Sequence, residues 1–308
     1  MPRICYTPKR FGADSLKRIE QANTIIREYA DAGYTLTLRQ LFYQFVSRDL
    51  LPNTTKSYKN LGSLLNDARL AGMVDWSAME DRTRNLRKVS TWDSPADIVY
   101  ACSKQFRMDF WADQPTYVEC FVEKDALLGV LEVACDPMQI PYFSCRGYTS
   151  ASELWSAAMR YTRIIGDSRR VVILHLGDHD PSGVDMTRDI EERIRLMVEH
   201  HLGPVHDGFE VRRIALNMDQ IQEYNPPPNP VKHTDSRATG YGALHGDESW
   251  ELDALPPDVL TNLIQTTAHE YIESDLWEEA EARQAEARRL LSEASNRWDA
   301  VEAFLNDA

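Results

Sequence analysis

The feature that most constrains this chain is a set of four short apolar runs separated by stretches with the periodicity of a helix. The runs cover residues 117–122, 140–145, 171–176 and 209–216. Between them, helices are expected over residues 125–134, 150–165 and 182–201. Strands that alternate with helices are typical of a parallel sheet with helical crossovers, and such strands are buried on both faces. The middle of the chain therefore predicts an α/β fold with a parallel sheet.

Acidic side chains follow two of these strands. Glu123 comes directly after the first run, and Asp178 and Asp180 come directly after the third, in the sequence GDHDPSG. The carboxyl ends of parallel strands share one edge, where ligands bind. Carboxylates gathered there repel one another unless a hard cation lies between them, so we predict that these three residues bind Mg²⁺ or Mn²⁺. A helix-capping turn is the alternative for the two aspartates. His179 is interpreted as a bystander and His175 as a core residue.

The first third of the chain predicts three helices, over residues 14–32, 37–47 and 54–70. The second begins with a capping box, Thr37 and Gln40, and its apolar residues share one face. At 100° per residue, Tyr43 points away from that face and lies one turn after Arg39. We therefore expect Tyr43 to lie off the core, next to Arg39, although a tyrosine that simply covers the side of the module is the alternative.

Charge is distributed unevenly along the chain. The net charge is −14 overall, yet residues 1–100 carry +4, residues 101–230 carry −7 and residues 231–308 carry −11. Only the first third is suited to contact phosphates. Together with the three helices, this predicts a helix-turn-helix or winged-helix module on double-stranded DNA, with an ordinary helical bundle as the alternative. The expected phosphate contacts are Lys56, Lys59, Arg69, Arg82, Arg84, Arg87 and Lys88.

Composition divides the chain into three parts and excludes several classes of protein. We expect a DNA-binding module over residues 1–92, a sheet domain over 93–224, and a segment over 225–308 that packs on the sheet domain or on a dimer mate. Within that segment, an irregular loop to residue 246 and one long acidic helix over 275–304 are expected.

No apolar run of ~18 residues and no secretory signal are present, so a cytoplasmic protein without a membrane partner is expected. Five scattered cysteines indicate free thiols.

Three motifs in this order resemble the A subunit of topoisomerase VI and its relatives that make meiotic double-strand breaks. They are Arg39-Gln-Leu-Phe-Tyr43, Val122-Glu-Lys-Asp-Ala126 and Asp178-His-Asp-Pro-Ser-Gly183, and the similarity covers roughly residues 35–200. The resemblance implies a winged-helix domain that carries the catalytic tyrosine, followed by a Toprim domain, a Rossmann-like parallel sheet that holds Mg²⁺. It identifies Tyr43 as the nucleophile and Glu123, Asp178 and Asp180 as the metal ligands.

The expected activity is DNA strand breakage by transesterification, with Arg39 stabilising the charge that develops on the phosphate. The resemblance further implies a homodimer, in which the tyrosine of one protomer faces the metal of its mate, and a separate ATP-binding B subunit. Two other functions remain open. One is a Toprim phosphodiesterase or nuclease that uses water as the nucleophile, and the other is a DNA-binding protein without catalytic activity.

Overall fold

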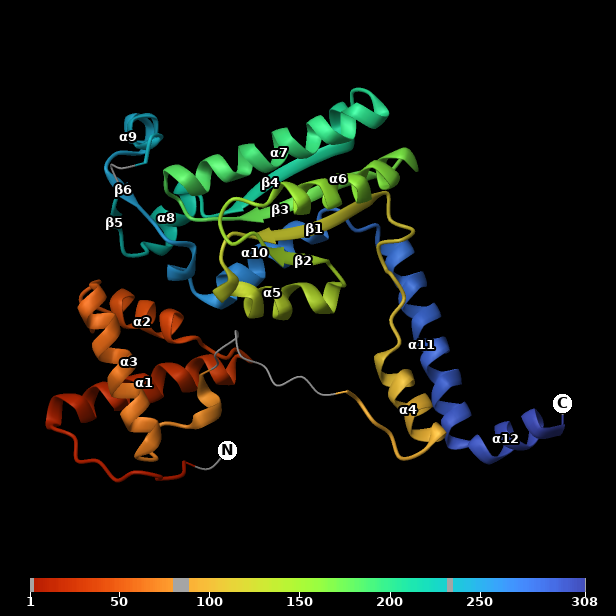
Figure 1. The fold of residues 1–308 in the computed structure, drawn as a ribbon, viewed down its shortest axis with the longest axis horizontal. Coiled ribbons are helices and arrows are strands. Elements are labelled where there is room, and N and C mark those ends of the chain that lie inside the picture. The colour runs from red at the N-terminus through yellow and green to blue at the C-terminus, as the bar shows by residue number, and fades with distance from the viewer. Residues whose placement is uncertain (1–2, 80–88, 232–234, 308) are drawn as a thin grey trace.

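The computed structural model describes residues 3–79, 89–231 and 235–307, and its architecture is the mixed α/β fold that the sequence predicts. In the view of Figure 1, a helical N-terminal module lies beneath a parallel sheet that has helices on both faces, and a pair of helices stands beside them. The chain enters the sheet domain only after the module is complete.

The sheet contains four parallel strands in the order β2-β1-β3-β4. Their bounds are β1 (Thr116–Val122), β2 (Tyr142–Ser144), β3 (Arg170–Leu176) and β4 (Phe209–Ala215). All four coincide with the predicted runs to within a few residues. β1 and β3 are paired along their whole length, ending with Val122 opposite Leu176. The residues that follow these two strands therefore emerge side by side at one edge of the sheet.

Alternate residues of β3 face two separate apolar cores. The four covering helices are α5 (Leu128–Cys135), α6 (Ala151–Gly166), α7 (Pro181–Leu202) and α10 (Pro257–His269). Val172, Leu174 and Leu176 pack with α5 and α10, whereas Val171 and Ile173 pack with α6 and α7. All five residues are fully buried, which explains why this strand is apolar at nearly every position. The helix α10 follows the sheet by about forty residues, so the C-terminal part of the chain completes the sheet domain.

The N-terminal module is built from α1 (Ala13–Asp31), α2 (Leu38–Ser47) and α3 (Thr55–Leu70) around one apolar core. The predicted capping box is present, since the Thr37 side chain accepts from the Gln40 backbone and the Gln40 side chain accepts from the Thr37 backbone. Within residues 3–79, two isolated β-bridges pair segments that lie outside the three helices, Cys5 with Ala71 and Leu36 with Met79. The predicted helical module is confirmed.

The segment after the sheet is more ordered than the sequence indicates. α8 (Met218–Tyr224) leads into a short antiparallel pair, β5 (Asn229–Pro230) with β6 (Glu248–Ser249), and α9 (Ala238–His245) lies between them. The prediction of an irregular loop to residue 246 is therefore wrong. The segment is ordered by a tertiary contact. The Tyr241 hydroxyl on α9 lies 3.0 Å from the His179 carbonyl and 3.1 Å from the Glu248 carbonyl, and this contact fixes the helix to the sheet domain.

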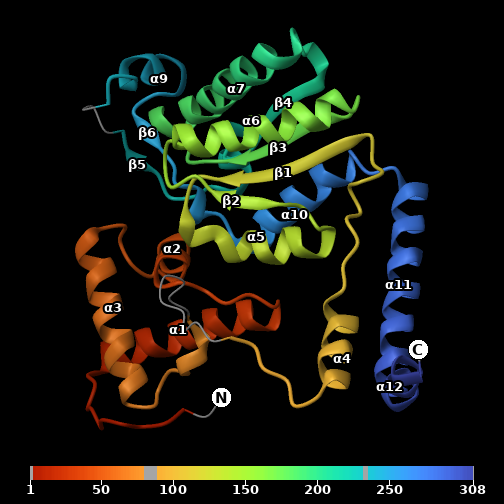
Figure 2. The ribbon, with the colours of Figure 1, turned by 45° about the vertical axis from the view of Figure 1, so that its right-hand side comes forward.

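The C-terminal residues form two helices where one was predicted. α11 (Ser274–Asn296) packs side by side with α4 (Pro95–Gln105), and α12 (Trp298–Asp307) follows after a change of direction at Arg297 (Figures 1 and 2). Gln284 of α11 accepts from the Met108 backbone, which ties this pair to the chain entering β1. In the described parts of the chain, no helix combines the length and apolar character needed to cross a membrane.

Candidate functional site

The acidic residues predicted to meet at the sheet edge do lie together. Glu123 follows β1, and its Oε2 accepts a hydrogen bond of 2.8 Å from the backbone N–H of Asp178, which follows β3. Gly183 makes this approach possible, because a Cβ atom there would lie 2.2 Å from the Asp178 carbonyl oxygen and 3.1 Å from Glu123 Oε2. The edge is therefore held by a backbone hydrogen bond, and position 183 has no room for a side chain.

Like Glu123, the other two acidic residues have structural partners. Asp178 Oδ1 accepts from the Leu252 N–H at 2.8 Å, and its Oδ2 lies 2.9 Å from Lys124 Nζ. Asp180 is the N-cap of α7 and accepts from the Gly183 N–H at 2.6 Å, which is the capping turn left open as its alternative. Among the residues described, no three histidine, cysteine, aspartate or glutamate side chains are arranged to hold a metal ion.

Burial favours the protonated forms of Asp178 and Glu123. Burial raises the pKa of Asp178 to about 7, and repulsion from Glu123 acts in the same direction, whereas Lys124 opposes both. Burial likewise raises the pKa of Glu123, although the Asp178 N–H and Lys124 stabilise its charged form. Carboxylate oxygens are the ligand type that Mg²⁺ and Mn²⁺ take in proteins, and a cation at this edge would lower the pKa of both groups. Within the described contacts, the ammonium of Lys124 supplies that positive charge to Asp178.

Arg213 of β4 also contributes to the edge, although the sequence did not predict it as a site residue. Its guanidinium donates to the carbonyls of Gly177, Asp178, Leu216 and Gly183, with the shortest of these bonds 2.6 Å to Asp178. Burial lowers the pKa of Arg213 to about 10, and the three edge carboxylates oppose that shift. Arg213 is thus a half-buried cation that fixes the loop after β3 and offsets its acidic charge.

A second acidic pair, Glu251 and Asp253, connects the sheet edge to the N-terminal module. These residues flank the start of the 3₁₀ helix η5 (Leu252–Ala254), which contacts α2. Lys124 Nζ lies 2.8 Å from Glu251 Oε2 and 3.0 Å from Asp253 Oδ1. Because Lys124 also contacts Asp178, one ammonium group joins three carboxylates.

Arg39 and Tyr43 meet this network from α2. Arg39 forms ion pairs with Glu251 and, from its Nε, with Asp253 Oδ2 at 2.6 Å. The Arg39 guanidinium lies 3.5 Å from the Tyr43 hydroxyl, so the predicted neighbours are in contact. Tyr43 is absent from the apolar core of the module, yet it is only 5% exposed, because the contact with η5 covers it. Burial raises the pKa of Tyr43, and the charges of Asp253 and Glu251 raise it further.

The residues predicted to contact DNA have three different placements. Lys56 and Lys59 are exposed on α3. Arg69 is half-buried, donates to the Met79 carbonyl at 2.9 Å and stacks on Trp76, which favours a structural role inside the module. The others lie outside the described residues: Arg82, Arg84, Arg87 and Lys88.

The two histidines near the edge are structural. His175 is fully buried, as predicted, and its Nδ1 lies 2.8 Å from Thr187 Oγ1. His179 was interpreted as a bystander, but its Nδ1 lies 2.7 Å from the Tyr241 hydroxyl, and its backbone pairs with Trp250. It therefore holds α9 and the chain that leads to Glu251 against the sheet edge.

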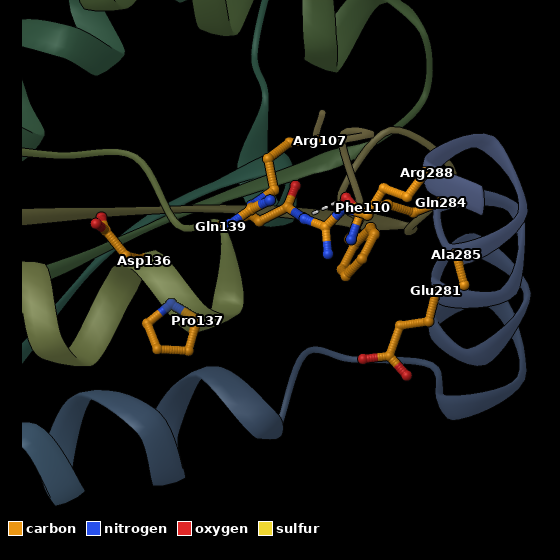
Figure 3. A pocket seen from close by; sticks show the side chains of 9 residues that line it. All are labelled: Arg107, Phe110, Asp136, Pro137, Gln139, Glu281, Gln284, Ala285 and Arg288. Carbon is orange, nitrogen blue, oxygen red and sulfur yellow. Dashed lines mark hydrogen bonds between the residues drawn. The ribbon is translucent and has the colours of Figure 1, made fainter. Parts of the chain in front are cut away.

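A cavity of about 350 Å³ lies elsewhere, between α11 and the turn after α5 (Figure 3). Its lining residues are Arg107, Phe110, Asp136, Pro137, Gln139, Glu281, Gln284, Ala285 and Arg288. None of the predicted site residues lines it. Tyr43, Arg39 and the acidic residues of the sheet edge therefore lie outside this cavity.

Sequence reasoning missed Lys124, Arg213, Glu251 and Asp253 as parts of the site. Lys124 follows Glu123 in a motif from which only the glutamate was assigned to the site. The alternation of Glu251 and Asp253 in WELDAL was the only local signal for the second acidic pair.

Comparison with protein-family models gave no match for the chain, and comparison with curated proteins gave no significant one.

Proposed function

We propose that this protein is a DNA strand-breaking transesterase of the topoisomerase VI A-subunit type, acting on double-stranded DNA in the cytoplasm, with Tyr43 as its nucleophile. One observation carries the proposal. Arg39, Glu251, Asp253 and Lys124 form a continuous series of ion pairs from Tyr43 to Asp178. Such chemistry requires a tyrosine beside an arginine and an acidic sheet edge, and here the two adjoin within one chain, whereas the resemblance implies that the tyrosine faces the metal of the partner protomer.

The reaction is a phosphoryl transfer from a sugar to a tyrosine. The Tyr43 oxygen loses its proton and attacks a DNA phosphorus, a phosphotyrosyl bond forms, and the bond from phosphorus to the sugar oxygen breaks. The departing sugar oxygen takes up a proton and leaves as a hydroxyl. Arg39 is placed to stabilise both the phenolate and the negative charge on the phosphate, since its charge lowers the pKa of Tyr43 against the effect of burial.

Mg²⁺ or Mn²⁺ is proposed as the cofactor, held by Glu123, Asp178 and Asp180. When bound, the ion would supply positive charge next to the DNA phosphates. Lys124 holds an oxygen of Asp178, so metal binding is expected to compete with that ion pair. DNA is proposed to approach through the module, with Lys56 and Lys59 among the phosphate contacts, and a homodimer and a separate ATP-binding B subunit complete the proposed partners.

One observation favours a second candidate, a metal-dependent nuclease that uses water. Tyr43 is nearly inaccessible in this conformation, and its pKa is raised. A buried, protonated phenol does not attack a phosphate. The transesterase proposal therefore requires the contact between α2 and η5 to open, whereas a water nucleophile at the sheet edge would not.

Trapping of a covalent complex separates these candidates. Supercoiled DNA is incubated with the protein and Mg²⁺, and the reaction is stopped with denaturing detergent. The proposal expects protein that stays attached to cleaved DNA, and complete loss of attachment in Tyr43→Phe with DNA binding retained. Tyr58→Phe is the matched control, because Tyr58 packs against the core of the same module. Cleavage by Tyr43→Phe at the unaltered rate would instead identify the water-dependent nuclease.

A further inference from the structure

A single carboxylate oxygen is shared by one cation from the N-terminal module and one from the sheet domain. Glu251 Oε2 accepts from the guanidinium of Arg39 on α2 and from the ammonium of Lys124 after β1, the latter at 2.8 Å. Burial opposes the charge of Glu251, but Lys124 and Arg39 together hold its pKa at about 2. Glu251 is therefore ionised at neutral pH, and together with Asp253 it offsets the charges of both cations.

We propose that Glu251 occupies the position of a DNA phosphate, and that Arg39 and Lys124 are the two cations that bind this phosphate when Glu251 moves away. This inference rests on the proposed function, because it takes DNA as the ligand. It assigns Lys124 to substrate binding and makes the segment around Glu251 an internal competitor of DNA.

The charges and shapes of the two ligands support this exchange. A phosphodiester carries one negative charge, as Glu251 does, so replacing one by the other leaves the charge of the network unchanged. Its two non-bridging oxygens are suitable acceptors for a guanidinium and an ammonium group, and arginine binds phosphate in a bidentate manner. Arg39 also lies against the Tyr43 hydroxyl, so a phosphate at this position would be next to the proposed nucleophile.

The burial of the three participants indicates which of them can move. The Asp253 side chain is fully buried, whereas that of Glu251 is 28% exposed and that of Arg39 is 44% exposed. Asp253 contacts Arg39 Nε and Lys124, so it keeps both cations in place when Glu251 leaves. Glu251 is thus the more exposed of the two carboxylates, and the contacts of Asp253 with both cations do not depend on it.

Binding of a short DNA duplex, measured by fluorescence anisotropy without metal so that no cleavage occurs, tests the proposal. Glu251→Gln should tighten binding about fivefold, since the loss of a competing ion pair worth about 1 kcal/mol corresponds to that factor. Glu248→Gln is the matched control, because it removes an exposed carboxylate three residues away and should change binding by less than about twofold. The gain from Glu251→Gln should become smaller when Arg39→Gln is also present, because only Lys124 is then left for Glu251 to release.

Two results would overturn the proposal. One is equal binding by Glu251→Gln and Glu248→Gln, and the other is a gain that persists in full with Arg39→Gln, because simple removal of negative charge would explain it. If Glu251→Gln does not fold, deuterium uptake by residues 249–255 of the unaltered chain decides. DNA should increase that uptake, and unchanged or reduced uptake contradicts release of Glu251. Covalent attachment, scored separately with Mg²⁺, shows whether the transesterase function itself fails.

Discussion

The sheet edge and the contact between α2 and η5 are adjacent, yet they are held in different ways. At the edge, Glu123 bonds to the Asp178 backbone, and Arg213 bonds to four backbone carbonyls. At the α2 contact, partly exposed side chains meet through ion pairs, chiefly Arg39 with Glu251. Backbone contacts buried in a sheet resist local opening, whereas partly exposed ion pairs contribute little and exchange readily. The edge is therefore the rigid half of the site, and the contact is the half that can open.

The largest effect on stability is expected from replacement of Arg213, the half-buried cation at the sheet edge. Arg213→Met should lower the free energy of unfolding by about 4 kcal/mol, because it leaves buried carboxylates uncompensated and carbonyls without donors. Chemical denaturation measures this. Arg212→Met is the control, since the neighbouring Arg212 makes a partly exposed pair with Glu270 and should cost less than about 1 kcal/mol. Equal losses in the two variants would remove the basis for calling the edge rigid.

A somewhat smaller loss is expected at the glycine that lets the edge close. Gly183→Ala places a Cβ atom 2.2 Å from the Asp178 carbonyl oxygen, so the start of α7 has to shift. We expect a loss of about 3 kcal/mol by the same measurement. Gly166→Ala at the end of α6 is the matched control, because the added atom meets nothing within 4 Å. If Gly183→Ala were as stable as Gly166→Ala, the close packing of the edge would be wrong.

The same contrast explains what the sequence could and could not predict. β3 and the Thr37 capping box were predictable because burial on both faces and capping chemistry leave local patterns. The meeting of Glu123 with Asp178 followed from the rule that parallel strands end at one edge. The burial of Tyr43 depends on Glu251 and its neighbours, which lie more than two hundred residues further along the chain. No local pattern specifies such a contact, and the break between α11 and α12 likewise occurs at Arg297, without a glycine or proline.

The smallest predicted effect concerns Asp178, which belongs to both halves of the site. Burial raises the pKa of Asp178 to about 7 in the folded chain, above its ordinary value of 3.8. The folded state therefore binds this proton more tightly, and the contribution of Asp178 to stability is fully present below pH 4 and lost as the pH rises through 7. We expect a change on the order of 1–2 kcal/mol, because Lys124 supports the ionised form.

Unfolding of Asp178→Asn and of the unaltered chain, followed between pH 4 and pH 8, tests this. The stability of the unaltered chain relative to Asp178→Asn should fall across that range, and Glu248→Gln should follow the unaltered chain. A difference that is constant with pH, or that grows in favour of the unaltered chain as the pH rises, would show that Asp178 is held as a carboxylate and that the edge is already neutralised.

The central claim, that Tyr43 becomes joined to DNA, is tested most directly by mass spectrometry of the trapped complex. After digestion of the DNA by nucleases and of the protein by trypsin, cleavage after Arg39 and Arg48 releases residues 40–48, in which Tyr43 is the only tyrosine. The account predicts that this peptide carries the mass of a nucleotide through a phosphotyrosyl bond. Cleaved DNA accompanied by an unmodified 40–48 peptide, or by a nucleotide on a different tyrosine, would contradict it.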